Sequence, residues 1–523
     1  MARSFGFGGL RCTASPAAFL RATANEKHIA MAVIDIVLPR NGTRLWHRRL
    51  AEALAAAGHH TQVVLGEREN LPPVLHTIIR LEQKLFLKGK KTLAACVPIL
   101  EPTARHTPDM TLALAEGGRT GLPTLRFMPN AAKSAIAEWA TVVAAGALPD
   151  LTLYGNDVPI SRAKPMIDNR AIFIRALDDV LARAVTLAVD GVRKALAGAD
   201  VAVVQPAPSE HSSSLLGNYL SSHLSRLVQE AWRRRRYHQA HWRVAYRFND
   251  GPGVAETGTL AGLPWTVLPD DSQRFYADPF PFEWEGQHYI FVEDYVHAVG
   301  KAVISVSVVD APGVALRPVP VLEEAHHLSY PQVLCRDGEV WMLPEASAGR
   351  EVVLYRCTRF PDRWERHAVL IDGKSLSDAT LLEHDGCLWL FATDNSLGGS
   401  SSDTLVVYRA DALAGPWEPH PQNPITIDRS AARPGGAMIR NGDKLTLPLQ
   451  DGTLGYGGGL GLAEIVKLTR QEVVLGAPRP IETNGFWPYP QIHTLNRHGP
   501  LEVIDGIAAV RRRRKNTPLP SSK

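Results

Sequence analysis

Several features that would assign a protein to a class are scarce in this sequence. Five cysteines are scattered over 523 residues with neither paired nor metal-ligand spacing, which suits a reducing compartment. No apolar stretch approaches the ~20 residues that cross a bilayer, and the net charge is only +4. We therefore expect a cytoplasmic protein without a transmembrane segment. Peripheral membrane contact and the oligomeric state stay open.

Motifs for common cofactors are also missing. The first strand-to-helix turn, LPRNGTRLW, has one glycine and no GxGxxG, so it predicts no dinucleotide site. No phosphate-binding loop of the form GxxxxGK is present. We interpret His326, His327 and His493 as ordinary loop or mouth residues, because they lack a metal-like pattern. No cofactor, no metal and no nucleic-acid partner is expected.

A unit recurs about every 50 residues through the C-terminal half. Each copy has a short strand, a tight turn and a second apolar strand that ends in a polar residue. The copies read YADPFPFEWEGQHYIFVED, SYPQVLCRDGEVWMLPEAS, SDATLLEHDGCLWLFATDN, RPGGAMIRNGDKLTLPLQD and, more weakly, WPYPQIHTLNRHGPLEVID. A repeat of this length with several strands per copy is typical of a β-propeller, here with five blades.

The fifth copy has too little chain after it to make four strands. The segment HWRVAYRF at 241–248 reads as a strand just before the first copy. We predict that this segment completes the last blade and closes the ring.

The N-terminal half has a different pattern, in which strands alternate with helices. AVIDIVL, TQVVLGE, TLRFMPN, LTLYGND and DVAVVQP read as strands, and residues 43–58, 131–146 and 170–198 as helices. This alternation predicts a parallel, doubly wound sheet of Rossmann-like type. The order of elements loosely resembles formyltransferase-like and glycosyltransferase-like halves of that fold.

The sequence thus predicts a multi-domain protein, α/β followed by all-β. Residues 1–30 are interpreted as an over-extended start or a disordered leader, and 510–523 as a disordered basic tail. Between them we expect a Rossmann-like α/β domain at 31–209, a basic amphipathic helical connector at 210–240 and the five-bladed propeller at 241–509.

The propeller sequence resembles two families. ADPFPFEWEGQHYIFVED looks like the opening blade of the five-bladed furanosidase-type propellers of arabinanases, xylosidases and invertase relatives. It is still more similar to the N-terminal propeller domain of plant glucosamine inositolphosphorylceramide transferases and their bacterial relatives. The resemblance covers about residues 260–510. It implies a carbohydrate-linked function, with a transferase-associated role favoured over hydrolysis.

The resemblance to the hydrolases also suggests site residues. Asp278 matches the catalytic base of the hydrolases, and Asp378 matches a second Asp. Arg433 stands where the hydrolases place a Glu as acid, and Glu293 and Glu345 are the alternative candidates for the acid and further candidates for substrate binding. A guanidinium suits phosphate or carboxylate, so Arg433 predicts an anionic ligand. For each Asp, a role in capping a turn is the alternative.

Further substrate-binding residues come from a repeated triplet. Tyr-Pro-Gln occurs in the second and fifth copies, and at the propeller mouth it would suit sugar stacking and hydroxyl bonding, as Tyr330, Gln332, Tyr489 and Gln491. Three classes of function remain open: a propeller that recognises a glycan or sugar-phosphate within a glycosyl-transfer or polysaccharide-synthesis system, a glycosidase that uses Asp278, and a non-catalytic scaffold.

Overall fold

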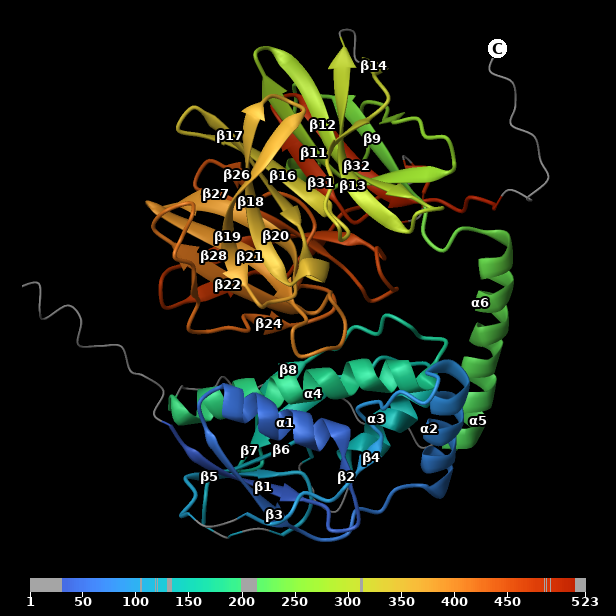
Figure 1. The fold of residues 1–523 in the computed structure, drawn as a ribbon, viewed down its shortest axis with the longest axis vertical. Helices are drawn as coiled ribbons and strands as arrows, with labels where there is room; N and C mark the ends of the chain where they lie inside the picture. Colours follow the sequence, from blue (N-terminus) through green and yellow to red (C-terminus); the bar gives the residue numbers. More distant parts are fainter. Residues whose placement is uncertain are drawn as a thin grey trace, which may run out of the picture.

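The fold is known from a computed structural model of the whole chain. It describes residues 31–103, 106–117, 119, 121–128, 134–198, 214–310, 314–483, 485, 487–489 and 491–512. The predicted strand DVAVVQP, the leader at 1–30 and the last eleven residues of the tail lie outside these ranges. The chain folds into a β-propeller and an α/β layer, which a long helical segment joins along one edge (Figure 1).

Five antiparallel sheets form the propeller, as the repeat predicts. The first contains β11 (Arg274–Trp284), β12 (Gln287–Val296), β13 (Lys301–Asp310), β14 (Val314–Ala315) and β15 (Val319–Leu322). The second contains β16 (Ser329–Arg336), β17 (Glu339–Glu345), β18 (Glu351–Arg359) and β19 (Arg363–Asp372), and a 3₁₀ turn spans Ser347–Gly349. The third contains β20 (Leu376–His384), β21 (Cys387–Asp394), β22 (Thr404–Ala410), β23 (Glu418–Pro419) and β24 (Thr426–Ile427).

The fourth sheet is more broken. It contains β25 (Arg433–Pro434), β26 (Ile439–Asn441), β27 (Lys444–Gln450), β28 (Leu460–Leu468), β29 (Val473–Leu475) and β30 (Arg479–Pro480). The glycines of ARPGG interrupt its innermost strand, since glycine weakens a strand interior. Apolar clusters fill the spaces between neighbouring blades.

The predicted closure of the ring is confirmed. The fifth sheet has the order β10 (Thr266–Val267), β9 (Trp242–Phe248), β32 (Leu501–Ile507) and β31 (Leu495–His498). β9 pairs antiparallel with β32 along its whole length, from Trp242 opposite Ile507 to Phe248 opposite Leu501. Helix α7 (Val254–Thr257) lies in the connection between β9 and β10. The two ends of the repeat therefore hold each other in one blade.

The N-terminal layer is built on a mixed sheet, and the prediction of a purely parallel sheet is wrong. Its strands are β3 (His60–Leu65), β1 (Val33–Leu38), β5 (Met110–Ala113), β6 (Thr124–Arg126), β7 (Leu151–Gly155) and β8 (Val158–Ala163), in that order. The first four run parallel, whereas β7 pairs antiparallel with both β6 and β8. The turn Asn156–Asp157 has two left-handed residues, as a two-residue hairpin requires. β2 (Thr43–Arg44) and β4 (Cys96–Val97) form a separate pair.

Helices α1 (Leu45–Ala56) and α4 (Phe173–Leu196) lie between this sheet and the propeller (Figure 1). α1, α3 (Ala135–Ala144) and α4 fall within the three predicted helices, and Gly58 has the left-handed conformation of a helix end. α2 (Pro73–Phe86) was not predicted. Its four buried residues, Leu75, Ile78, Ile79 and Glu82, have helical spacing, and that pattern is the signal for it.

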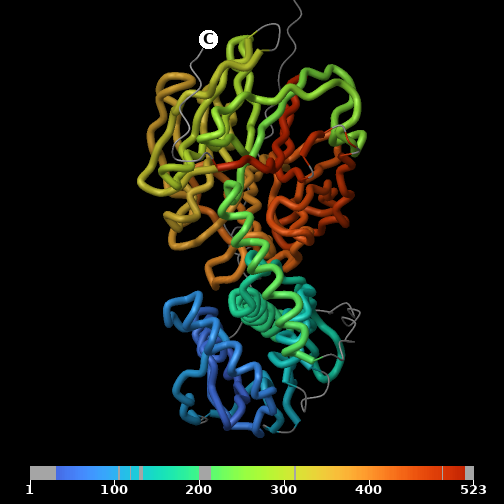
Figure 2. The backbone as a smooth tube through the Cα atoms, turned by 90° about the vertical axis from the view of Figure 1, so that its right-hand side faces the viewer, coloured from blue at the N-terminus to red at the C-terminus, as the bar shows by residue number. Residues whose placement is uncertain are grey.

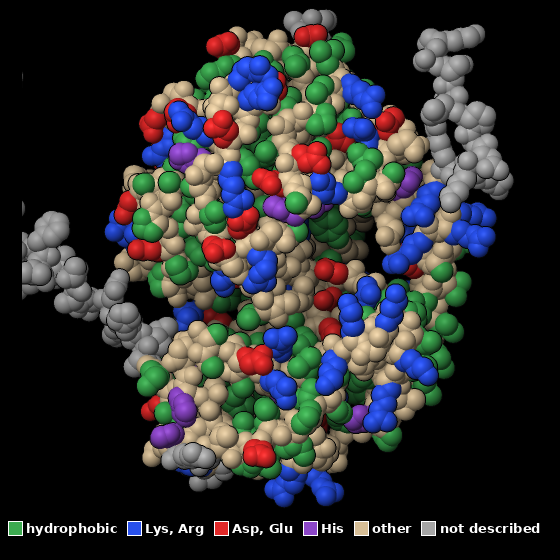
Figure 3. Space-filling model, viewed as in Figure 1, with side chains coloured by type: hydrophobic (Ala, Val, Ile, Leu, Met, Phe, Trp, Pro, Cys, Tyr) green, Lys and Arg blue, Asp and Glu red, His purple; other side chains and the backbone are tan. Residues whose placement is uncertain are grey.

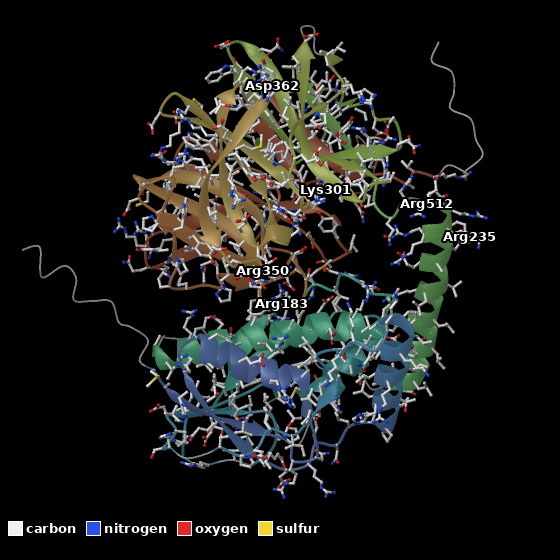
Figure 4. All side chains as sticks on the ribbon, viewed as in Figure 1. Arg183, Arg235, Lys301, Arg350, Asp362 and Arg512 are labelled. Atoms are coloured by element: carbon white, nitrogen blue, oxygen red, sulfur yellow. The ribbon has the colours of Figure 1, made fainter. Side chains whose placement is uncertain are left out.

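Ion pairs and hydrogen bonds join the α/β layer to the propeller. Arg183 on α4 points toward the propeller (Figure 4), and its Nε lies 2.6 Å from Oδ1 of Asp403. The same guanidinium donates to the carbonyls of Gly398 and Ser400. Lys164 also pairs with Asp428 at 2.6 Å. Because the Arg183–Asp403 pair is buried, it fixes the position of α4 against the third blade.

A helical segment connects the two parts. It consists of α5 (Leu215–Tyr219), a π-helical turn (Leu220–Leu224) and α6 (Ser225–Arg236). Figure 2 shows that it crosses from the α/β layer to the propeller. A helical connector was predicted in this place. Among the described helices, none is both long and apolar enough for a membrane span.

Candidate functional site

The first strand of each of blades one to three carries the same irregularity near the propeller axis. Asp278, Tyr330 and Asp378 have positive φ angles of 48°, 48° and 51°. At each of them the pairing with the second strand shifts register. A left-handed residue at a strand bulge turns its side chain out of the regular alternation. The repeat thus places three non-glycine side chains at one structurally equivalent point.

Arg433 is not equivalent to these residues, although the sequence repeat aligns it with them. In blades one to three, the residue just before the bulge lies opposite the end of the second strand: the pairs are Ala277 with Glu293, Ser329 with Glu345, and Ser377 with Thr393. In the fourth blade Arg433 lies opposite Gln450, the corresponding residue of the second strand. Arg433 therefore occupies the position one residue before the bulge. The alignment with the hydrolase acid is off by one residue, because ARPGG lacks the bulge that sets the register in the other blades.

Arg433 and Asp378 nevertheless meet. Nε and one terminal nitrogen of Arg433 donate to the two carboxylate oxygens of Asp378 at 2.7 and 3.1 Å. Its other terminal nitrogen donates to the carbonyl and hydroxyl oxygens of Ser401 and to the hydroxyl of Ser402. Every guanidinium nitrogen thus has a partner within the protein. The two-point contact expected with an anionic ligand is made with Asp378 instead.

Burial and the charge of Arg433 shift the pKa values of the neighbouring carboxyl groups. Burial raises the pKa of Asp378, and the guanidinium opposes this rise. Burial would also raise the pKa of Glu345, but Arg433, 3.7 Å away, and hydrogen bonds from Asp378 and Ser347 together lower that pKa. Glu345 in turn accepts a hydrogen bond from the backbone N–H of Asp378. Glu345 is therefore an ionised carboxylate at neutral pH.

A second buried cluster surrounds Asp278. Thr494 donates to Asp278 at 2.9 Å, and Nε2 of His493 lies 3.6 Å from the same carboxylate oxygen. Nδ1 of His493 is 2.7 Å from Asp505. Burial would lower the pKa of His493, but the carboxylates of Asp505, Asp278 and Asp378 together raise it to about 9. Burial raises the pKa of Asp278 to about 7, with His493 opposing.

His493 was interpreted as an ordinary loop or mouth residue, but its side chain is buried among carboxylates. Asp278, His493 and Asp505 offer ligand atoms within 4.8 Å of one another, the geometry of a possible metal site. Asp505, however, already accepts hydrogen bonds from the backbone N–H groups of Asp278, His493 and Thr494. We interpret the three residues as a hydrogen-bond network that fixes the orientation of the His493 ring. Asp278 comes from blade one and the other two from blade five, so no spacing in the sequence connects them.

A cavity of about 1110 Å³ opens above these clusters, at the propeller mouth that faces the α/β layer. Glu293, Glu345 and Arg433 line it, whereas Asp278 and Asp378 do not. Its aromatic lining residues are Trp242, Phe275, Tyr295 and Tyr456. The Trp242 ring stacks on His493 at 3.8 Å between centroids, and the Tyr456 ring meets both edge-on. These two rings separate the Asp278 cluster from the cavity.

Several lining residues were not anticipated from the sequence. His327 lies 3.3 Å from Glu293. Burial would lower its pKa, but Glu293, with Glu345 and Asp278 nearby, raises it above the ordinary value. His238 and His297 stack at 3.7 Å on the side of the helical connector. Serine hydroxyls contribute from the second and third blades, at positions 329, 347, 377, 401 and 402. Single polar residues of this kind carry no sequence signal until the blades are assembled.

The Tyr-Pro-Gln residues lie elsewhere. The Tyr330 hydroxyl is buried, contacts Thr380 at 2.8 Å and accepts the N–H of Gly436. The Gln332 amide bonds both backbone groups of Leu381 in the next blade. Tyr489 packs on Trp487, and neither it nor Gln491 is among the residues that line the cavity. Tyr330 and Gln332 thus join blades, and the role in sugar binding stays a prediction for these residues.

Comparison with known proteins agrees with the family resemblance. Residues 268–487 match the family model "Glucosamine inositolphosphorylceramide transferase 1, N-terminal". Glucosamine inositolphosphorylceramide transferase 1 of Oryza sativa subsp. japonica is 34% identical over 247 residues, 45% of this chain and 33% of that protein. The Arabidopsis thaliana protein of the same name is 30% identical over 218 residues, 41% of this chain and 27% of that protein. The resemblance to this family is confirmed. The chain spans about a third of the length of these relatives.

Solved structures with some likeness include glycoside hydrolases. One is Zg3597, a family 117 glycoside hydrolase of Zobellia galactanivorans, with 11% identity and a TM-score of 0.33 over 46% of this chain and 76% of that one. Another is CoXyl43, a β-xylosidase/α-arabinofuranosidase from a compost metagenome, with 13% identity and a TM-score of 0.31 over 46% and 93%. A likeness at this level says nothing on activity.

Proposed function

We propose that the propeller binds a neutral carbohydrate in the cavity at its mouth, as the recognition part of a glycosyl-transfer system. The family match makes the propeller carbohydrate-related. The observation that carries the proposal is a cavity of sugar-binding size with two carboxylates, Glu293 and Glu345, among hydroxyls and aromatic rings. Carboxylates accept hydrogen bonds from sugar hydroxyls, and rings pack on sugar faces.

A neutral sugar is favoured over a sugar-phosphate because of the charge around the cavity. The one arginine of the central cluster, Arg433, already donates to Asp378, Ser401 and Ser402. A phosphate at the axis would have to displace those contacts while it approached Glu345 and Glu293. Arg512 also lines the cavity, but it lies beside the helical connector, next to Arg236. Like charges at such distances disfavour binding.

Binding of a panel of neutral and phosphorylated oligosaccharides to the full chain tests this proposal. Glu345→Gln and Glu293→Gln keep the shape but weaken charge-assisted hydrogen bonds, so we expect about tenfold weaker binding or more for each. Glu339→Gln, which alters a carboxylate paired with Arg356 outside the cavity, is the matched control. Preference for phosphorylated ligands, or equal binding by all variants, would contradict the proposal. A chain that binds no glycan at all would leave the scaffold hypothesis.

One observation favours glycoside hydrolysis as the alternative. A pKa of about 7 at Asp278 suits a group that exchanges protons near neutral pH. Its carboxylate lies below the cavity, however, and does not line it. We therefore expect no turnover of arabinosides, xylosides or fructosides. Turnover that Asp278→Asn abolishes would establish the glycosidase instead.

A further inference from the structure

The helical connector carries a row of exposed apolar side chains. They recur every four residues from α5 through the π-helical turn to α6, and their exposed fractions lie between 46% and 64%, at Leu216, Leu220, Leu224, Val228 and Trp232. We call these five residues the apolar row. In a regular α-helix, residues four apart drift by about 40° around the axis. The wider π-helical turn in the middle reduces that drift.

The opposite face of the segment is already partnered. Tyr219 donates to Glu82 at 2.9 Å, and Nε2 of His223 contacts the carbonyl of Val143 at 2.9 Å. Ser222 and Arg226 bond backbone carbonyls of the α3 end, at Ala145 and Gly146. These contacts fix the rotation of the segment. The apolar row is therefore held outward, away from the α/β layer, and α6 has no buried residue.

A basic cluster stands at the end of the apolar row. It comprises Arg233–Arg236 and the start of the tail, where Arg512 donates its N–H to the carbonyl of Arg236. Figure 4 shows Arg235 and Arg512 close together at this end of α6. Figure 3 shows apolar side chains along the edge of the segment and blue ones above them. The Arg236 guanidinium lies over the Trp232 ring at 4.6 Å.

Acidic residues are scarce on this segment. Residues 215–236 contain five Arg and one Glu, a balance of +4. The Glu, Glu230, pairs with Arg233 and Arg234. Among the residues that the structure describes, Arg235 has no carboxylate partner and Arg236 has only the Trp232 ring. An apolar row that ends in Trp and in unpaired Arg complements an anionic lipid surface.

We propose that this face, the apolar row with its basic cluster, docks the protein on an anionic membrane surface. Leucines enter the headgroup boundary, Trp232 lies at the interface, and the arginines meet lipid phosphates and carboxylates. A second copy of the chain is a poorer occupant. A parallel pair of such helices would bring two basic clusters together without an acidic patch to receive them.

The docking face adjoins the cavity. His238 and Gln239, which follow the end of α6, line the cavity together with Arg512. A membrane bound along the connector would lie beside the cavity mouth. The inference does not depend on what the cavity binds, since it rests on the outer face of the helix alone.

Flotation of the full chain with vesicles tests the proposal. The probes are vesicles of phosphatidylcholine alone and of phosphatidylcholine with about one third phosphatidylserine, at low salt and in 1 M NaCl. We expect binding to the anionic vesicles that falls in high salt, because salt screens the attraction. Leu220→Ser with Leu224→Ser should weaken it by about a hundredfold. Arg235→Gln with Arg236→Gln should weaken it by about thirtyfold.

Val314→Ser with Val466→Ser is the matched control, because both valines are exposed on the propeller, at 60% and 64%. This variant should float like the wild type. Circular dichroism and the melting temperature confirm that each variant is folded. No flotation, equal flotation with neutral vesicles, or variants that all bind alike would overturn the proposal. A dimer in sedimentation that the leucine variant dissociates would assign the face to a second copy.

Discussion

Two buried arginine–aspartate pairs stabilise different parts of this molecule. Arg183 with Asp403 lies between α4 and the third blade, and Arg183 is 1% exposed. Arg433 with Asp378 lies at the propeller axis, where Arg433 is 7% exposed and borders the cavity. The chemistry is the same. Arg183 also donates to two backbone carbonyls and lines a separate cavity of about 610 Å³ between α1, α4 and the propeller. Arg433 lines the cavity that Glu293 and Glu345 also line, so the neighbouring residues decide which pair belongs to the proposed site.

The interface pair is expected to give the largest effect. Arg183→Met leaves Asp403 buried without a cation, because its other neighbours are the N–H of Met166 and Thr404. Breaking such a pair costs about 3–5 kcal/mol of unfolding free energy. Denaturant unfolding measures it, and Arg49→Met, which removes an exposed pair with Glu52, should cost under ~1 kcal/mol. Equal losses for the two variants would contradict the role of this pair.

The axial pair should give a smaller loss of stability and a larger loss of binding. Arg433→Met leaves Asp378 next to Glu345, but water in the cavity can reach the place of the guanidinium. We expect about 2–4 kcal/mol, together with loss of sugar binding in calorimetry. The control is Arg366→Met, because Arg366 is exposed and pairs with Glu351. Unchanged binding in a folded Arg433→Met would separate this pair from the site.

His493 allows a test of the axis by pH. Its pKa is raised to about 9 from an ordinary 6.5, so the folded state binds its proton more tightly than the unfolded state does. Its stabilising contribution is complete below about pH 6.5 and is lost as the pH rises to about 9, up to about 3 kcal/mol. Unfolding measured from pH 6 to 9.5 should show this fall. His493→Gln should flatten it, and a wild-type profile that is flat would contradict the charged state.

Tyr330 should show the smallest effect and should sharpen the boundary of the site. Tyr330→Phe removes the hydroxyl that accepts the N–H of Gly436, which costs about 1–2 kcal/mol. Sugar binding by this variant should equal that of the wild type. Weaker binding without a change in stability would return Tyr330 to the site, as the sequence first suggested.

The sequence by itself determined the elements that depend on local periodicity. The repeat predicted five blades and their closure through 241–248, because each strand pair carries its own alternation and turn. Helices 43–58, 131–146 and 170–198 were predicted from their spacing in the same way. The hairpin of β7 and β8 was missed because Pro159 and a short polar strand obscure its alternation.

Only the tertiary structure decided which side chains meet. Asp278 and His493 are 215 residues apart in the chain and come together because β9 and β32 close the ring. Arg433 aligned with Asp278 by sequence, yet its strand lacks the bulge, so it reaches Asp378 from one position earlier. Tyr330 looked like a ligand residue but faces the next blade. A repeat fixes where a residue lies along its strand, whereas bulges and ring closure decide where its side chain points.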